Sequence, residues 1–416
     1  MDIYKKVLDE HKVTEEEGNK LLASAGYVLH KLQDEINRNE IDAEVMLGGS
    51  AAKGTFVKGD FDCDVFIRFE KKYIDDQLSE MLEHCLKIFQ GVNRVHGSRD
   101  YFQAKIDNID FEFVPVKKIS NPNEALNVTD SSPLHVQWMK KNIEINPELI
   151  DQIILTKLFC KAARVYGAES YIRGFSGHVI DILLAYYKTF ENLLKNSLEW
   201  KKGDVIDVES HGTSQEMNAS KINSLIVIDP IQPERNAAAA LNMENVQFFQ
   251  KKACEFLQKP SCEFFKKKPL TKEYLESIKD GNSLFIIMAE PLEGKDDVVG
   301  AKILKVFEYI KKQLKAHDFE VVQSGWEWDK KNDAMLYFLV NPEILSEFKL
   351  REGPPVKVTE NASKFRELHP DAWEENGRLY ANVKRDFTSA DKLIEHLISN
   401  DYIKEKVKSI RSISQT

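Results

Sequence analysis

The chain of 416 residues lacks any apolar run close to the roughly 20 residues that a membrane-spanning helix needs, and its N-terminus does not read as a signal peptide. It also lacks paired cysteines, because the five present are scattered and form no Cys-x-x-Cys motif. These absences argue against a membrane protein, a zinc site and a disulfide framework. We therefore expect a soluble globular protein with free thiols, located in a reducing cytoplasm.

An excess of positive charge is absent as well, since the formal net charge is −9 at pH 7. Proteins that bind nucleic acids contact phosphates through Lys and Arg, so this balance argues mildly against such a partner. A local basic face would still suffice for RNA. Four clusters could supply it: Lys251-Lys252, Lys266-Lys267-Lys268, Lys311-Lys312 with Lys315, and Lys384-Arg385.

The segment 48–55, Gly-Gly-Ser-Ala-Ala-Lys-Gly-Thr, is suited to holding phosphates. Gly48 and Gly49 lack a Cβ, so their backbone can reach positive φ and point its N–H groups at an anion. Ser50 adds a hydroxyl and Lys53 a positive charge. The preceding residues read as a short strand, and a loop that leaves a strand end is where α/β proteins place their sites.

Two aspartates follow this loop on a second predicted strand, residues 61–69. Asp62 and Asp64 alternate with apolar residues, so both side chains point to one face, with Cα atoms about 6.5–7 Å apart. Carboxylate oxygens in this arrangement can bind one or two hard cations such as Mg²⁺. Two such cations can stabilise the attacking and the leaving oxygen of a phosphoryl displacement. The pattern therefore indicates nucleotidyl transfer.

A third carboxylate is expected from a neighbouring strand. Residues 101–106 and 109–116 read as two strands joined by Asp107-Asn108, a two-residue turn typical of hairpins. Asp110 and Glu112 lie at alternate positions of the second strand and therefore share a face. The spacing alone does not choose between them.

The rest of the chain divides into segments that differ in the spacing of their apolar residues. A capping box at Thr14 to Glu17 opens a helix, and a further helix is expected near 75–90, which with the strands makes a mixed α/β catalytic domain. The chain then becomes helical, with helices from about Asn146 to Tyr166, from Ser176 to about Leu194, and through Asn236 to about Phe256.

After Pro269 a β-α-β-β order is predicted at 284–289, 298–314, 319–325 and 335–340. The segment 351–385 is rich in charge and forms an appended module, and the last 30 or so residues are expected to be helical. We thus predict an α+β multidomain protein with a mixed sheet in the catalytic domain. The expected domains are 1–135, a helical 136–258, a small α/β domain of 259–350 with 386–416, and the 351–385 module.

Together these motifs resemble the archaeal-type (class I) CCA-adding tRNA nucleotidyltransferases of the polymerase-β-like superfamily. Beyond the loop and Asp62-x-Asp64, the resemblance rests on four further segments. They are Asp130-Ser131-Ser132-Pro133-Leu134-His135, Lys157 with Tyr166-Gly167-Ala168-Glu169, Arg173-Gly174-Phe175-Ser176-Gly177, and Asp229-Pro230 with Arg235-Asn236-Ala237-Ala238-Ala239. The likeness is strong over residues 40–250 and weaker over 280–395, and it implies head, neck, body and tail domains.

The resemblance implies roles for individual residues. Asp62 and Asp64 would bind metal, and the family's third ligand, an Asp two residues before a Val-Pro pair, falls on Glu112 rather than Asp110. The expected nucleotide-binding residues are Ser50, Lys53, Ser132, His135, Lys157, Tyr166 and Arg235. Lys53 stands where the family usually has Arg, which keeps the charge but loses the bidentate fork. Arg235, just inside an expected helix start, matches the arginine that reads the base.

The mechanism so implied uses two Mg²⁺ ions held by Asp62, Asp64 and Glu112 to transfer nucleotides from CTP and ATP onto a tRNA 3′ end, without a template. The acceptor and TΨC arms of the tRNA would be recognised by shape. The sequence does not give the oligomeric state, although relatives are often dimers and a homodimer is one option. Relatives also usually carry a further basic C-terminal stretch.

Two other readings share part of this pattern. A poly(A) polymerase or oligoadenylate synthetase has the same metal motif but takes ATP only. An inactive RNA-binding relative would have lost its metals because Glu112 replaces an Asp, although the presence of both Asp62 and Asp64 argues against this reading.

Overall fold

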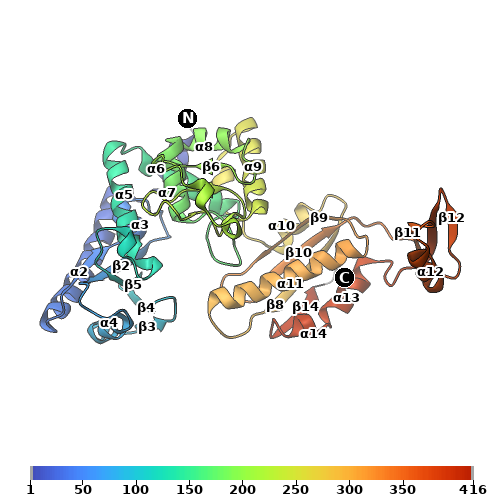
Figure 1. The fold of residues 1–416 in the computed structure, drawn as a ribbon. Coiled ribbons are helices and arrows are strands. Elements are labelled where there is room, and N and C mark those ends of the chain that lie inside the picture. The colour runs from blue at the N-terminus through green and yellow to red at the C-terminus, as the bar shows by residue number, and fades with distance from the viewer. Residues whose placement is uncertain (1–2, 414–416) are drawn as a thin grey trace. The chain divides into compact units, whose positions relative to one another are not determined.

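The computed structural model describes residues 3–413. The chain forms two compact units that divide between Lys267 and Lys268. Figure 1 follows the first unit from blue to yellow and the second from yellow to red. None of the helices in the described residues combines the length and the apolar character that crossing a membrane requires.

The first unit begins with a five-stranded mixed sheet in the order β1-β2-β5-β4-β3. β2 and β5 run parallel, whereas every other neighbouring pair is antiparallel. The strands are β1 (Ala43–Leu47), β2 (Asp62–Phe69), β3 (Asn93–Val95), β4 (Tyr101–Ile106) and β5 (Ile109–Lys117). Asp107 and Asn108 both have positive φ, 50° and 63°, and close the β4–β5 hairpin as the sequence predicted.

Helices α2 (Glu15–Arg38) and α4 (Leu78–Leu86) contribute to a core on one face of this sheet. Thr14 and Glu17 form the predicted capping box at the start of α2. The strand residues in that core are apolar and include Cys63, Val65, Phe111 and Phe113. Because strand side chains alternate, the residues between them point to the other face.

A helical layer completes the first unit. It contains α1 (Ile3–His11), α5 (Ser132–Ile145), α6 (Leu149–Ala162), α7 (Gly177–Tyr187), α8 (Phe190–Ser197) and α9 (Met243–Gln258). Its core is rich in buried phenylalanine rings, including Phe159, Phe190, Phe249 and Phe256. The N-terminal helix α1 packs into this core through Val7, although α2, which follows it, packs on the sheet.

Two features of the helical layer differ from the sequence predictions. The helix expected to run from Ser176 to Leu194 is broken, because Lys188 takes φ 69° and Thr189 caps a new helix, α8. The helix expected through Asn236 begins only at Met243. Residues 237–240 instead form turns, because the buried amide of Asn236 accepts from Val227 N and Ala238 N and donates to Lys221 O and Leu225 O.

The region 200–228 holds a parallel pair of short strands, β6 (Val205–Ile206) and β7 (Ile226–Val227). An isolated bridge between Ile228 and Asn236 extends this pairing. Arg235 therefore lies in a closed loop between Ile228 and Asn236, and the prediction that it stands just inside a helix start was wrong.

The second unit contains a four-stranded antiparallel sheet in the order β14-β8-β10-β9. The predicted β-α-β-β order is confirmed by β8 (Ser283–Glu290), α11 (Asp296–Ala316), β9 (Val321–Glu327) and β10 (Ala334–Val340). The long helix α11 lies across the sheet in Figure 1. The C-terminal segment is helical only in α13 (Ala390–Ile398) and α14 (Asp401–Lys404), since β14 (Ser409–Ile413) joins the sheet beside β8.

Residues 348–384 form a three-stranded sheet, β11 (Phe348–Pro355), β13 (Arg378–Lys384) and β12 (Trp373–Glu375) in that order, with α12 (Thr359–Leu368). A small core of Ala362, Phe365, Leu379 and Ala381 joins the helix to the sheet. This is the segment in which the sequence predicted an appended module. Short helix α10 (Lys272–Ser277) packs on β8 at the start of the second unit.

Candidate active site

The glycine-rich loop follows β1 and packs directly on β2. Gly48 N donates to Asp64 O at 2.7 Å, and residues Gly49–Lys53 form one short helix, α3. Gly49 takes φ 52°, and a Cβ there would lie 1.6 Å from Asp64 Oδ2. Gly48 is extended, with φ −119°, so only the second glycine uses the left-handed conformation that the sequence analysis expected of both. The loop therefore packs directly against Asp64.

Four carboxylates lie on the sheet face opposite the apolar core. In the parallel register of β2 and β5, Asp62 pairs with Asp110 and Asp64 pairs with Glu112. The first pair is exposed and the second is partly buried. Asp110 also forms an ion pair with Lys105, at 3.2 Å. Glu112 is thus the direct neighbour of the carboxylate that packs on the glycine loop.

Asp64 has an unfavourable setting for a charged group. Burial raises its pKa above the ordinary value, the nearby Asp62 carboxylate raises it further, and Lys53 and Lys157 oppose this effect. A bound cation would relieve the repulsion between the aspartates. A set of Asp and Glu oxygens is the donor chemistry that hard divalent cations prefer, so the residues fit such a metal.

A second buried carboxylate, Asp181 on α7, lies among three residues predicted to bind nucleotide. Lys53 forms a buried ion pair with it, and its charge acts on Lys157 and Tyr166. Only one of its oxygens has a hydrogen-bond partner in the structure. Asp181 was not predicted from the sequence. The sequence feature that could have identified Asp181 is its place as a single acidic residue inside the apolar run Val179–Ala185.

Lys157 on α6 reaches the glycine loop. Its ammonium donates to Thr55 O at 3.0 Å and to Thr55 Oγ1 at 3.3 Å. Burial, with the nearby charge of Lys53, lowers its pKa to about 8. Tyr166, which follows the end of α6, is bridged to Phe175, and burial raises the pKa of its phenol.

The Arg173-Gly174-Phe175 motif has a steric explanation, because a Cβ on Gly174 would lie 2.1 Å from Val165 O. Gly174 thus allows the chain to return closely beside Val165, where Phe175 N donates to Val165 O at 2.7 Å. This return sets the position of Tyr166 and of Ser176, which caps α7 by accepting from Val179 N. The motif therefore builds the start of α7.

The Asp130 to His135 motif contains a structural carboxylate followed by candidate site residues. Asp130 is fully buried and accepts from Arg99 Nη1 at 2.5 Å and from Lys117 N at 2.8 Å. These bonds fix the start of α5 against the end of β5. Ser132, the first residue of α5, and Ser50, in α3, are both partly buried. The two helices pack against each other.

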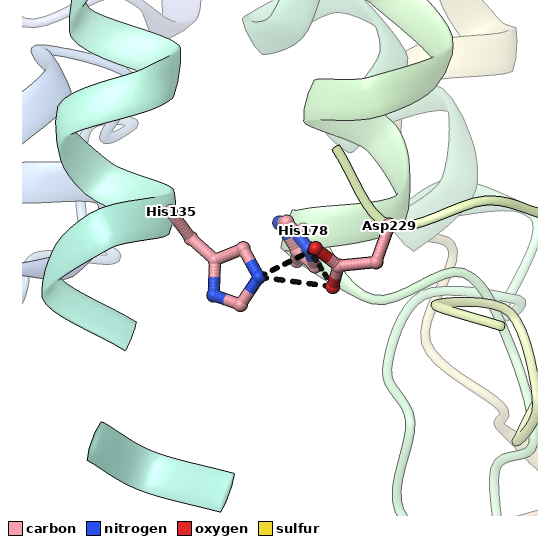
Figure 2. A group of neighbouring side chains, drawn as sticks. All are labelled: His135, His178 and Asp229. Carbon is pink, nitrogen blue, oxygen red and sulfur yellow. Dashed lines mark hydrogen bonds and ion pairs between the residues drawn. The ribbon is translucent and has the colours of Figure 1, made fainter. Parts of the chain in front are cut away.

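His135, from the first turn of α5, belongs to a compact polar cluster shown in Figure 2. Its Nε2 lies 2.9 Å from both oxygens of Asp229, which is fully buried. His178 Nε2 on α7 lies 3.2 Å from Asp229 Oδ2, and Arg235 Nη1 donates to the same oxygen at 2.9 Å. The sequence predicted His135 and Arg235 as site residues, named Asp229 only as part of a motif, and missed His178.

The ring nitrogens of the two histidines and a carboxylate oxygen of Asp229 lie within 4.8 Å of one another, a spacing compatible with a metal site. Asp229 is already saturated, however, because Oδ1 also accepts from Ile231 N and Gln232 N and Oδ2 from Arg235. A cation would have to displace a guanidinium from the same oxygen. Burial opposes ionisation of Asp229, but the hydrogen bonds from both histidines hold its pKa below the ordinary value. We interpret the cluster as a hydrogen-bonded network.

Curated relatives resemble this chain over most of its length. A CCA-adding enzyme of Nanoarchaeum equitans is 35% identical over 358 residues, which cover 84% of this chain and 86% of the relative. CCA-adding enzymes of Methanosarcina mazei and Methanocaldococcus jannaschii are each 29% identical, cover 96% of this chain, and are themselves covered to 89% and 91%. Similarity of this extent includes both compact units.

A crystal structure of the Cid1 poly(U) polymerase bound to MgATP has a TM-score of 0.51 and 12% identity, and covers 64% of this chain and 98% of that one. This likeness supports the fold alone. Three family models match in chain order: a nucleotidyltransferase domain at 29–135, the second domain of tRNA nucleotidyltransferase at 151–266, and the C-terminal domain of the CCA-adding enzyme at 281–412. With the identity to the Nanoarchaeum relative, these matches establish that the chain belongs to the CCA-adding tRNA nucleotidyltransferases.

Proposed function

We propose that this protein adds and repairs the CCA end of tRNA with CTP and ATP, without a template, and that Asp62, Asp64 and Glu112 hold two Mg²⁺ ions for this reaction. The observation that carries the proposal is the β2–β5 register, which sets Glu112 beside Asp64 while Asp64 packs on the glycine loop. When bound, the metal ions activate the tRNA 3′-hydroxyl and neutralise the leaving pyrophosphate. The family itself implies use of a divalent metal.

The protein's part in this reaction is to position the triphosphate. Ser50 and Lys53 on α3, Ser132 at the start of α5, and Lys157 and Tyr166 are the groups that we assign to it. The two lysines add positive charge in a partly buried setting, where an anion is held more strongly than in water. When a phosphate approaches, the Lys53 ammonium must either leave its ion pair with Asp181 or contact the phosphate and Asp181 together.

His135 and Arg235 are assigned to the nucleotide base. Their alignment by a single carboxylate favours this assignment, because both side chains approach Asp229 from different elements. The protein discriminates against other nucleotides jointly with the tRNA end, since no template strand is used. An enzyme restricted to ATP is disfavoured by the full-length similarity to CCA-adding enzymes.

We further propose the division into head (1–135), neck (136–258), body (259–350 with 386–416) and tail (351–385). In this division the body and tail domains grip the acceptor and TΨC arms of the tRNA by shape. The exposed lysines of α11 and the small sheet of 348–384 are candidates for that contact. A homodimer remains part of the proposal, by analogy with relatives.

The test is nucleotide addition to a tRNA transcript that lacks its CCA end, with CTP and ATP supplied separately and together. We expect D64N and E112Q to lower kcat by about a hundredfold or more, because each removes a metal ligand. The matched change D110N should alter kcat by less than about threefold, since Asp110 is exposed and paired with Lys105. Removal of divalent cations with EDTA should stop addition, and Mg²⁺ should restore it.

Other outcomes would contradict separate parts of this proposal. Addition of A without any addition of C would exclude CCA synthesis. If D110N lost activity while E112Q kept the activity of the wild type, Asp110 rather than Glu112 would be the third metal ligand. Binding of tRNA without Mg²⁺-dependent turnover would indicate an inactive relative.

A further inference from the structure

The loop from Ile228 to Asn236 is closed by a single side chain, that of Asp229. Its Oδ1 accepts from Ile231 N and Gln232 N, both at 3.1 Å, and its own N–H donates to Arg235 O at 3.0 Å. The bridge between Ile228 and Asn236 closes the base of the loop. Asp229 is 0% exposed, so these bonds are shielded from water. The carboxylate therefore has a fixed position in the fold.

Three side chains from three different elements converge on this fixed carboxylate. His135 comes from α5, His178 from α7 and Arg235 from the loop itself. Their side chains are 11%, 23% and 37% exposed, so each reaches the surface of the site while Asp229 does not. The two imidazole rings also pack together, with centroids 4.2 Å apart. One buried charge thus sets the direction of three accessible groups.

The contact with Asp229 also determines which nitrogen of His135 carries a proton. An ionised carboxylate can only accept, so Nε2, at 2.9 Å from both oxygens, must be the donor. Figure 2 shows the other ring nitrogen, Nδ1, facing away from Asp229. Burial, opposed by the Asp229 hydrogen bond, lowers the pKa of His135 and so favours the neutral ring. In the neutral ring with Nε2–H, Nδ1 is a hydrogen-bond acceptor.

We propose that Asp229 is the positioning residue for base selection: it presents His135 Nδ1 as an acceptor and directs the Arg235 guanidinium as a donor. Cytosine and adenine both carry an exocyclic amino group, which an acceptor recognises, whereas uracil and guanine carry a carbonyl oxygen at the corresponding place. His178 supports this arrangement by packing on His135 and sharing Asp229. The inference rests on the proposed function, because it assigns these residues to the base of CTP or ATP.

The experiment measures kcat and KM for CTP, ATP and UTP on tRNA substrates ending at the point of C or A addition. In D229N the amide can no longer accept from all its donors, so we expect KM for CTP and ATP to rise at least tenfold with kcat changed by less than threefold. The preference for CTP over UTP, as a ratio of kcat/KM, should fall at least tenfold. Loss of kcat with an unchanged ratio would indicate a merely structural role and overturn the proposal.

Two further variants keep the test decisive. H135Q places an amide N–H near the position of Nε2 but has no group at Nδ1, so it should keep the contact with Asp229 and still lose preference for CTP over UTP. An unchanged preference in H135Q overturns the proposal, even where D229N does not fold. The control D207N changes a carboxylate of the same layer that accepts from Gly212 N, and it should leave the ratio within twofold. If the wild-type protein adds no nucleotide at all, the proposed function fails instead.

Discussion

At the scale of single residues, the sequence predicted charged groups of the candidate site but not the two buried carboxylates, Asp181 and Asp229, that contact some of them. Strand alternation groups Asp62 with Asp64 and Asp110 with Glu112, and only the family resemblance favours Glu112 over Asp110. The register of β2 and β5 is consistent with all four sharing one face. Asp181 and Asp229 could not be assigned in the same way, because their importance depends on partners that are distant in sequence. Lys53 lies 128 positions from Asp181, and His135 lies 94 positions from Asp229.

Lys157 gives a prediction about pH dependence. Its pKa is about 8 in the folded protein and 10.5 in the ordinary state, so between these values the unfolded chain binds more protons. Burial of the charged form therefore destabilises the protein below pH 8, and this cost disappears as the pH rises toward 10.5. The full difference between the two pKa values corresponds to about 3 kcal/mol in the free energy of unfolding.

We accordingly expect the free energy of unfolding of the wild type, relative to K157M, to increase between pH 8 and pH 10.5. The measurement is urea unfolding of both proteins in that interval, without metal or nucleotide. K161M is the control, because Lys161 lies one turn further along α6 and is less buried. A constant difference between wild type and K157M across the interval would show that Lys157 is not titrating there.

At the scale of elements, most helices and strands were predictable because their patterns are local. The capping box of α2, the Asp107-Asn108 hairpin and the order β8-α11-β9-β10 depend on residues close together in the chain. The segment 236–241 was not predictable in this way. Its alanines favour a helix, but the amide of Asn236 binds backbone groups of the β7 region, and this tertiary contact outweighs the local propensity.

N236A tests this explanation. The amide of Asn236 makes four hydrogen bonds in a buried setting, and its removal leaves backbone groups without partners. We expect the free energy of unfolding of the first unit to fall by about 2–4 kcal/mol. Urea unfolding followed by tryptophan fluorescence reports on this region, because Trp200 lies in the same core.

The control for that measurement is N223A. Asn223 is exposed, and its side chain makes one hydrogen bond, to Ala239 O. Its loss should change the free energy of unfolding by no more than about 0.5 kcal/mol. Equal effects of the two changes would mean that the turns at 237–240 have another cause.

At the scale of the whole molecule, the fold class was predictable, whereas the core against which α1 packs was not. Within the segment 1–135, α1 packs on the helical core, where Tyr4 contacts Phe190 and Phe256. Sequence periodicity shows that a helix is amphipathic, but it does not show which core receives the apolar face.

V7D tests the placement of α1. Val7 is 1% exposed, so an Asp there would bring an unpaired charge into the helical core. We expect faster hydrogen exchange in α6 and α9 and unchanged exchange in β2 and β5, measured by mass spectrometry. K6D, which places the same side chain on the exposed side of α1, should leave both regions unchanged. Faster exchange confined to the sheet would contradict this packing.

The packing of α1 also has a consequence for how the protein is made. Residues 3–11 leave the ribosome before the helix at 149–162 and the short turn at 262–265, against which they pack. The five-stranded sheet, encoded between these segments, has its own core and can form while α1 is still without its partners. Synthesis therefore allows the five-stranded sheet to fold before the helical core closes around α1.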